Sequence, residues 1–284
     1  MRRLATIPSR MPEGPEIRRA AARIDRVLAG RTVEHAELTQ PHLRRLAASL
    51  IGQQVDLVTS RGKAMLIRFA DGRTLYSHNQ LYGVWRLCKR GKLPKTKRQL
   101  RLALHTATDS ALLYSASDIS VWRQEELHQH PFLARIGPDI LSSTLTWQDL
   151  ASRLQSSQFS GRSLAALYLD QQFLAGIGNY LRSEILFAAA VDPAARPKDL
   201  TRAQINTLAR QTLGVSRRSY RSGGVTLTDK QYRWLRDQDL SYEEARFMVF
   251  GRRDLPCHVC GTKIKRTQAG ARRLYSCANC QAIG

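Results

Sequence analysis

Four cysteines near the end of the chain constrain its fold more strongly than any other feature. Cys257, Cys260, Cys277 and Cys280 follow the spacing C-x2-C-x16-C-x2-C. This spacing is typical of a zinc ribbon, in which four thiolates hold one Zn²⁺ tetrahedrally and fix a β-hairpin. Because four protein ligands leave no open position on the metal, we predict a structural zinc and no catalytic one. A redox-active pair is the alternative for a C-x-x-C motif.

The charge of the chain indicates a polyanionic partner. Lysine and arginine number 45 against 23 acidic residues, which gives a net charge of +22 in 284 residues. An excess of this size, spread along the chain, favours nucleic acid binding over a membrane role. The sequence contains no apolar run long enough to span a membrane and no secretion signal, so we expect a protein of the reducing cytoplasm. The length predicts two domains.

Periodicity divides the chain before the cysteines into two regions. Residues 15–29 predict a helix with one apolar face that stops at Gly30. Short β segments separated by turn residues then predict an antiparallel sandwich or barrel. The predicted strands are 55–59, 65–69, 75–77, 84–88, 100–104 and 112–114. From Thr146 onward the period is helical, with helices expected at 147–154, 163–174, 180–190 and 201–213, and residues 216–250 expected as a loop.

The stretch Met11-Pro12-Glu13-Gly14-Pro15-Glu16 offers unusual chemistry if translation starts at Met11. Removal of that methionine would leave Pro12 as a free secondary amine, with a reference pKa of about 8 against about 10.4 for lysine. An unprotonated amine attacks electrophilic carbon, and Glu13 would lie within proton-transfer reach. The simpler interpretation is a turn followed by a helix with proline in its first turn. As an internal residue Pro12 has no lone pair to offer, so we expect residues 1–10 to reflect a misassigned start.

Four further positions are candidates for binding or catalysis, each with a structural alternative. Lys63 follows the turn at Arg61-Gly62 and supplies a proton donor or a solvated surface charge. Gln80-Leu81-Tyr82 is an apolar wedge for a base stack or a turn packed inward. Arg135 contacts a phosphate or has a structural role. Asn179 follows Gly176-Ile177-Gly178, whose backbone amides offer a phosphate site or an ordinary helix hairpin.

In this order, these motifs resemble the formamidopyrimidine-DNA glycosylase/endonuclease VIII family. The resemblance runs from Met11 to the end of the chain and is carried by residues 11–17, 61–63, 76–85 and 173–182 with the four cysteines. It implies an α+β fold: an N-terminal antiparallel β-sandwich with a flanking helix, and a helical helix–two-turn–helix domain with a zinc-finger β-hairpin. The implied boundaries are 11–130 for the sandwich, 131–145 for a hinge, 146–250 for the helical domain and 251–284 for the finger.

The resemblance also implies a role for each candidate residue. Pro12 would be the nucleophile on C1′ of the damaged nucleotide, with Glu13 managing protons at the sugar. Lys63 would donate a proton during β-elimination, and Arg272 in the finger would grip phosphate and assist δ-elimination. The void left by the flipped base would be filled by Gln80, Leu81 and Tyr82, and DNA phosphates would be contacted by Arg135 and Asn179.

The implied function is that of a monomeric DNA glycosylase and abasic-site lyase acting on damaged double-stranded DNA, with no metal or small-molecule cofactor in the chemistry. The contiguous Gln80–Tyr82 wedge looks like the endonuclease VIII branch, which implies oxidised pyrimidines such as thymine glycol. Departures from the family pattern are residues 1–10, the long stretch 216–250 and Arg273 beside Arg272. Oxidised purines, a non-catalytic role in binding damaged DNA and a basic zinc-ribbon protein that binds RNA remain alternatives.

Overall fold

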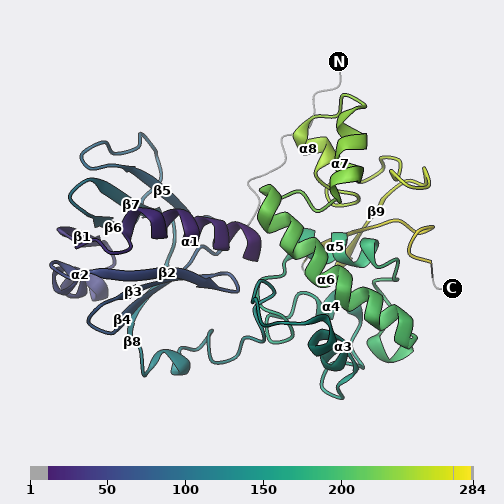
Figure 1. The fold of residues 1–284 in the computed structure, drawn as a ribbon, viewed down its shortest axis with the longest axis horizontal. Coiled ribbons are helices and arrows are strands. Elements are labelled where there is room, and N and C mark those ends of the chain that lie inside the picture. Colours follow the sequence, from purple (N-terminus) through teal and green to yellow (C-terminus); the bar gives the residue numbers. More distant parts are fainter. Residues whose placement is uncertain (1–11, 271, 283–284) are drawn as a thin grey trace. The chain divides into compact units, whose positions relative to one another are not determined.

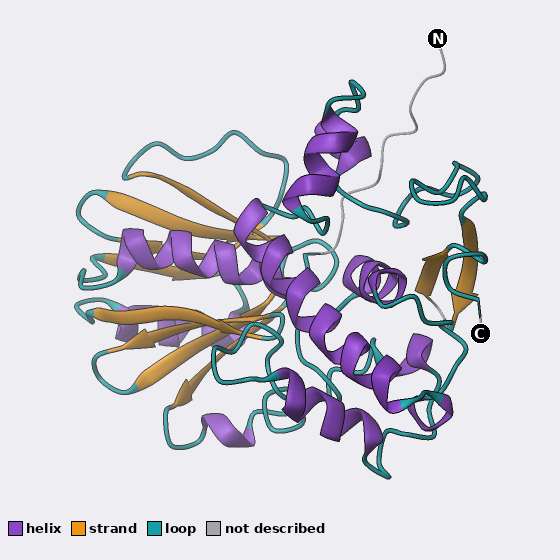
Figure 2. Ribbon diagram, turned by 45° about the vertical axis from the view of Figure 1, so that its right-hand side comes forward, coloured by secondary structure: helices purple, strands orange, loops and turns teal. Residues whose placement is uncertain are grey.

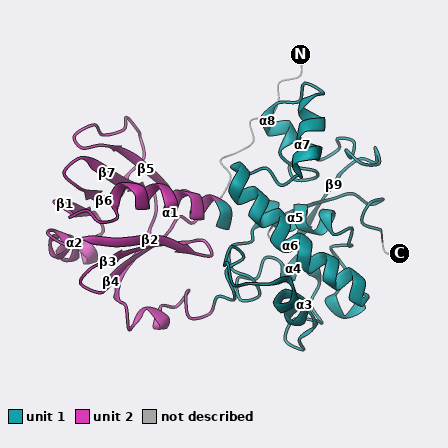
Figure 3. Ribbon diagram, in the orientation of Figure 1, with its two compact units in different colours: residues 1–9, 13–15, 136–284 teal, residues 10–12, 16–135 magenta. Residues whose placement is uncertain are grey.

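The chain divides into two compact units in the computed structural model, which describes residues 12–270 and 272–282 (Figure 3). Among these residues, the N-terminal unit holds Pro12 and Glu16–Arg135, and the C-terminal unit holds Glu13–Pro15 and the residues from Ile136 onward. The first residues of the first helix are thus grouped with a unit whose remaining sequence begins more than a hundred positions later. No described helix is both long and apolar enough to cross a bilayer.

The N-terminal unit is a β-sandwich with a helix along it, as the sequence predicts (Figures 1 and 2). Its two antiparallel sheets have the strand orders β1-β6-β7-β5 and β2-β3-β4-β8. The strands are β1 (His35–Leu38), β2 (Val55–Arg61), β3 (Ala64–Phe69), β4 (Arg73–His78), β5 (Val84–Lys89), β6 (Leu100–His105), β7 (Asp109–Tyr114) and β8 (Asp118–Arg123). The helices are α1 (Gly14–Leu28), α2 (Arg44–Leu50) and the short 3-10 turns η1 (Pro41–Leu43) and η2 (Leu127–Gln129).

One apolar core fills the space between the two sheets and α1. Both sheets contribute to it, for example through Ile67 on β3 and Leu104 on β6, which are fully buried. From α1 it receives Ile17, Ala21, Ile24 and Leu28, which are spaced three or four residues apart and share one face. The spacing read from the sequence therefore gave the correct helix and the correct buried face.

The C-terminal unit is helical, with a small hairpin at its end. Its helices are α3 (Trp147–Gln155), α4 (Leu164–Leu167), α5 (Asn179–Ala188), α6 (Arg202–Ser222), α7 (Asp229–Arg236) and α8 (Tyr242–Ala245), with η3 (Pro197–Asp199). The hairpin consists of β9 (Lys265–Ala269) and β10 (Arg272–Ser276). Apolar side chains of α3 to α6 form one core, and the residues around α7, α8 and the hairpin form a second. Together with the sandwich, these elements confirm the predicted α+β fold.

Two predictions about this region are wrong. The helix expected at 163–174 is a single short helix, Leu164–Leu167, followed by turns that lead to Gly176, whose φ of 105° no helix allows. The loop expected at 216–250 contains the end of α6 and two further helices. Helix α6 passes through Gly214 because Val215, Ser216 and Ser219 are buried against the core, and it ends at Gly223 in the left-handed conformation.

Candidate functional site

The carboxylate of Glu13 lies at the N-terminus of α5. It accepts hydrogen bonds from the backbone N–H groups of Gly178 and Tyr180, each at 2.8 Å, and of Leu181 at 3.2 Å. Glu13 is 4% exposed, so these donors take the place of water. A negative charge at this position also interacts favourably with the positive end of the helix dipole. The side chain expected to manage protons thus fixes residue 13 to the start of a helix 165 positions further along the chain.

Glycines make this close approach possible. A Cβ at position 178 would lie 2.5 Å from Cδ of Glu13, well inside van der Waals contact. Gly14 donates its N–H to the carbonyl of Gly176 at 2.8 Å, and a Cβ on Gly14 would lie 3.1 Å from Cα of Gly176. The amides that the sequence suggested for phosphate binding are therefore occupied by a carboxylate of the chain itself, which corrects that interpretation of the Gly176-Ile177-Gly178 turn.

A buried arginine links Asn179 to the cysteine-bearing hairpin. Nη2 of Arg182 donates to Oδ1 of Asn179 at 3.2 Å and to the carbonyl of Arg273 at 2.9 Å, while Nη1 donates to the carbonyl of Ala165 at 2.8 Å. Burial lowers the pKa of Arg182 to about 10; the Glu13 carboxylate opposes this shift and the charge of Arg272 adds to it. At neutral pH the guanidinium therefore stays ionised, and it ties α5 to β10.

These contacts bring three of the predicted residues to the N-terminal end of α5. Glu13 binds the amides of its first turn, Asn179 is its first residue, and Arg272 begins β10, one residue before the carbonyl that Arg182 grips. Arg272 is exposed, and it pairs with Ala269 across the hairpin. In the C-terminal unit, Glu13 and Asn179 thus lie at the first turn of α5, and the buried Arg182 guanidinium binds both Asn179 and the residue next to Arg272.

The four cysteines converge as the spacing predicts. Their Sγ atoms lie within 4.8 Å of one another, with Cys257 to Cys280 at 3.9 Å and Cys260 to Cys277 at 3.4 Å. A tetrahedral zinc with Zn–S bonds of about 2.3 Å places its sulfur atoms about 3.8 Å apart, so this cage fits the ion. All four positions are filled by protein, which makes the zinc structural. The hairpin is held to α5 by the bond from the N–H of Tyr275 to Oγ of Ser183, at 3.3 Å.

In the N-terminal unit, Lys63 lies at the same end of the sheet as the proposed wedge. It occupies the turn between β2 and β3 and is half-buried; its neighbour Ala64 pairs with His78, the last residue of β4. Burial is the main reason why the pKa of His78 is lowered; the Asp118 carboxylate opposes the shift and the Lys63 ammonium adds to it. The Lys63 ammonium is therefore close enough to His78 to disfavour its protonation.

The wedge residues form the turn between β4 and β5, where the chain passes from one sheet to the other. Leu81 and Tyr82 are 51% and 68% exposed, so the inward-packed alternative is wrong. Gln80 adopts a φ of 48° and accepts a hydrogen bond from Oγ of Ser117 at 2.8 Å, while Arg98 donates to the carbonyl of Tyr82 at 2.7 Å. Two large apolar side chains are thus presented to solvent on a turn that is fixed at both ends.

The same turn depends on Gly83. Its N–H donates to the carbonyl of Asn79 at 2.7 Å, and a Cβ at position 83 would lie 2.6 Å from both Cα and the carbonyl oxygen of Asn79. Glycine is needed here because two backbone segments meet, and no flexible side chain is present that could move away.

The two remaining candidates lie at the edges of the sandwich unit. Pro12 is half-buried two residues before the start of α1, and the residues before it lie outside the described part of the chain. Arg135 is exposed, and its Nε donates to the carbonyl of Pro131 at 2.8 Å.

Sequence reasoning missed two charged residues of α5 that organise this region. Arg182 is described above, and Glu184 accepts hydrogen bonds from Oγ1 of Thr226 at 2.7 Å and from three successive amides, Met248 to Phe250, each at 2.8 Å. Glu184 is 2% exposed and joins α5 to the segments on either side of α7 and α8. The available signal was a pair of opposite charges inside a largely apolar helix, because such charges are seldom buried without partners.

Comparisons with known proteins agree with this arrangement. Three family models match in order: the formamidopyrimidine-DNA glycosylase N-terminal domain at residues 11–117, the formamidopyrimidine-DNA glycosylase H2TH domain at 136–231, and the zinc finger found in FPG and IleRS at 254–283. The last match and the sulfur cage confirm the structural zinc site.

Curated relatives cover nearly all of the chain. Endonuclease 8 of Escherichia coli O17:K52:H18 is 45% identical over 271 residues, which are 95% of this chain and 100% of that protein. Endonuclease 8 of Salmonella arizonae is 44% identical with the same coverage.

Solved structures share the fold at lower identity. Lactococcus lactis formamidopyrimidine-DNA glycosylase bound non-covalently to DNA with an abasic site has a TM-score of 0.78 at 19% identity, covering 95% of this chain and 100% of that one. The same enzyme with DNA containing an oxidised pyrimidine has a TM-score of 0.80 at 20% identity, covering 96% and 100%. Three matched domains in order and full-length relatives at this level of identity show that the chain belongs to the formamidopyrimidine-DNA glycosylase/endonuclease VIII family.

Proposed function

We propose that this chain, a DNA glycosylase and abasic-site lyase of base excision repair by its family, removes oxidised pyrimidines from duplex DNA through a covalent bond to Pro12. The observation that carries the substrate choice is the single exposed turn that presents Gln80, Leu81 and Tyr82 together. Relatives named endonuclease 8, 45% identical over their whole length, support the same choice. The net charge of +22 suits a DNA partner.

The proposed reaction begins with the unprotonated nitrogen of Pro12. The nitrogen attacks C1′ of the flipped nucleotide, the bond from C1′ to the base breaks, and the base leaves with the bonding electrons and takes up a proton. The bond from C1′ to the ring oxygen then opens, that oxygen gains a proton, and the nitrogen loses its own to give an iminium. Glu13 is the group next to Pro12 in the chain that would assist these proton transfers.

The iminium then drives strand cleavage. It acidifies C2′–H, and loss of that proton expels the 3′ phosphate. A second elimination expels the 5′ phosphate, and water finally hydrolyses the adduct and restores the amine. We assign proton donation in the first elimination to Lys63 and phosphate binding in the second to Arg272. Arg135 and Asn179 would contact other phosphates, and the wedge would occupy the space left by the flipped base.

This chemistry requires Pro12 to be the first residue of the working protein. The match to the N-terminal family model begins at Met11, which supports a start there followed by removal of the methionine. We therefore propose that residues 1–10 are not part of the active form. From the family resemblance we further propose a monomer that acts on DNA in the cytoplasm and uses no cofactor in catalysis beyond its own amine.

Trapping with borohydride tests the proposal. The protein that starts at Met11 is incubated with duplexes carrying thymine glycol, 8-oxoguanine, an abasic site or no lesion, and borohydride reduces any iminium to a stable crosslink. We expect crosslinks with the abasic site and thymine glycol at Pro12, located by mass spectrometry of the adduct. Crosslinking to 8-oxoguanine in preference to thymine glycol would assign the oxidised-purine activity. Tight binding without any crosslink would assign a binding role. In a competition experiment, preference for single-stranded RNA over the lesion-containing duplexes would exclude a repair enzyme.

A further inference from the structure

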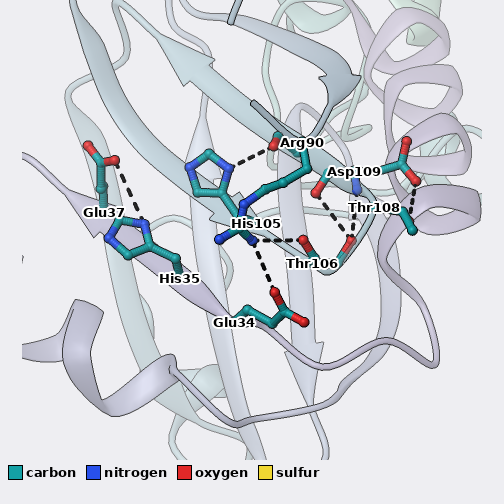
Figure 4. A network of polar contacts seen from close by, with 9 residues as sticks. Glu34, His35, Glu37, Arg90, His105, Thr106, Thr108 and Asp109 are labelled. Atoms are coloured by element: carbon teal, nitrogen blue, oxygen red, sulfur yellow. Dashed lines mark hydrogen bonds and ion pairs between the residues drawn. The ribbon is translucent and has the colours of Figure 1, made fainter. Parts of the chain in front are cut away.

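A second cluster of metal-ligating side chains lies in the N-terminal unit, apart from the four cysteines. It consists of His35 and Glu37 on β1 and His105 on β6 (Figure 4). One potential ligand atom from each residue lies within 4.8 Å of those of the other two. Among the described residues, this is the one such group besides the cysteine cage.

The strand register places the three side chains on one face. His35 lies directly opposite His105 in the antiparallel pair of β1 and β6, and their ring centroids are 5.5 Å apart. Glu37 is two residues beyond His35, so its side chain leaves the same face of the strand. Oε1 of Glu37 is 3.8 Å from Nδ1 of His35. The proximity of the three groups is therefore built into the backbone pairing and does not depend on a flexible loop.

His105 is held in one orientation from behind. Its Nδ1 is 2.7 Å from Oγ of Ser110, a fully buried residue that pairs with it across β6 and β7. The other ring nitrogen points toward His35 and Glu37 (Figure 4). A metal-binding imidazole usually has its second nitrogen fixed by a hydrogen bond in this way, because the bond sets the ring orientation and the tautomer.

The charged groups around the cluster are compatible with a bound cation. The Arg90 guanidinium is nearby, but it donates to the carbonyl of Thr106 at 2.8 Å and to the carboxylate of Glu34 at 3.4 Å. Glu34 thus offsets the charge of Arg90, and the carboxylate of Glu37 remains beside the two imidazoles (Figure 4). Glu37 and His35 are about half exposed, with side-chain exposures of 46% and 51%, so solvent can supply the remaining ligands.

We propose that His35, Glu37 and His105 bind one divalent transition-metal ion of the zinc type, which clips the edge strand β1 to β6. Two imidazoles and one carboxylate are ligands that zinc takes readily, whereas calcium and magnesium prefer oxygen alone. Tetrahedral zinc with bonds of about 2.1 Å brings ligand atoms to about 3.4 Å, so the cluster has to close by roughly 1.4 Å at most. The two exposed side chains can make that movement while His105 stays in place.

The position of β1 at the edge of its sheet indicates what a bound ion would stabilise. β1 has four residues and forms one edge of its sheet, with β6 as its single neighbour. Short edge strands are held by few backbone hydrogen bonds and are exposed to mispairing. An ion bound by one ligand from β6 and two from β1 would lower the rate at which this strand opens.

Calorimetric titration of the full chain with zinc chloride, after the cysteine site has been loaded, tests the proposal. We expect the wild-type protein to bind one further zinc ion per chain. His35→Gln and Glu37→Gln should each weaken that binding by roughly tenfold or more. Both side chains are exposed, so these variants test the site even if His105→Gln fails to fold. His42→Gln, which removes an exposed histidine outside the cluster, is the matched control and should bind as the wild type does.

Hydrogen exchange completes the test, because it follows the strand itself. Zinc should slow exchange of the β1 amides in the wild-type protein and in His42→Gln, but not in His35→Gln. The site is refuted if the wild-type protein takes up no further zinc or if His35→Gln binds it equally well. Binding that depends on His35 but leaves β1 exchange unchanged would refute the clip.

Discussion

Replacing Glu13 by glutamine should loosen the N-terminal end of α5 as well as slow the chemistry. Oε2 of Glu13 accepts from Gly178 and Leu181, and Oε1 accepts from Tyr180. A glutamine has one oxygen and an NH₂ group in these places. The NH₂ cannot accept, so at least one backbone N–H then faces another donor in a site where only 4% of residue 13 reaches solvent.

The magnitude follows from these contacts. Loss of one hydrogen bond to a charged acceptor costs about 1.5 to 3 kcal/mol, and loss of the negative charge at the helix N-terminus costs up to about 2 kcal/mol more. We therefore expect Glu13→Gln to lower the local stability by about 1.5 to 5 kcal/mol. At about 1.4 kcal/mol for each factor of ten, the lower bound corresponds to a roughly tenfold larger equilibrium constant for local opening at the first turn of α5.

Native-state hydrogen exchange at the amides of Tyr180 and Leu181 measures this effect directly. Glu125→Gln is the matched control: Glu125 is exposed on the sandwich unit, and its neutralisation should change stability by less than about 0.5 kcal/mol. If exchange at both amides is the same in Glu13→Gln as in the wild-type protein, the carboxylate does not hold the helix, and the reasoning is wrong.

Gly178→Ala separates anchoring from proton transfer. The new Cβ would lie 2.5 Å from Cδ of Glu13, so the carboxylate must move although its chemistry is intact. If Glu13 acts partly by holding its neighbour Pro12 in place, Gly178→Ala should slow borohydride trapping of the protein that starts at Met11. Trapping at the wild-type rate, together with a slow Glu13→Gln, would leave proton transfer as its whole contribution.

Four further predictions concern the other parts of the molecule. Arg272→Ala should weaken binding to all duplexes alike and reduce the dependence of log K on log salt by about one phosphate contact; an unchanged slope in a salt titration would place the residue away from the backbone. Gly83→Ala should distort the wedge turn because its Cβ meets Asn79 at 2.6 Å, and should reduce excision of a lesion more than cleavage of a preformed abasic site, as measured by single-turnover rates. Chelation of zinc should unfold the finger and abolish DNA binding, with recovery on addition of zinc; binding that survives verified zinc loss would contradict a structural role. Burial lowers the pKa of His130 below its ordinary 6.5, so the unfolded chain takes up the proton more readily than the folded protein. The free energy of unfolding should therefore fall as the pH drops from about 6.5. His130→Asn can still accept the two backbone N–H bonds but cannot be protonated, so its free energy of unfolding in urea should change less between pH 7 and pH 5.

The parts of the fold that could be predicted are those whose information is local. The helix at α1 follows from apolar residues spaced by a helical turn, and the strands β2 to β7 follow from short β segments between turn residues. The zinc cage follows from cysteine spacing, because each C-x-x-C pair supplies two ligands from one tight turn. The exposure of Leu81 and Tyr82 was one of two outcomes that the sequence left open.

The predictions that failed depended on packing. β1 and β8 were overlooked; β1 has only four residues, and each of the two strands pairs with a single neighbour, β6 or β4, that is distant in sequence. Helices α7 and α8 begin with the capping pairs Thr228–Gln231 and Ser241–Glu244, which were readable, but their short apolar faces are defined only by the core they cover. Helix α6 continues past Gly214 for the same reason.

By itself the sequence determined the presence of a β-sandwich, a helical region and a zinc-binding hairpin, and the chemistry that each candidate side chain can perform. The tertiary structure decided the use of Glu13 as an anchor for α5, of Arg182 as the link between Asn179 and the hairpin, and of His35 and His105 as neighbours. The physical reason is separation along the chain. A hydrogen bond between residues 13 and 180 leaves no periodic trace in either segment, and only the folded backbone brings such groups within reach of each other.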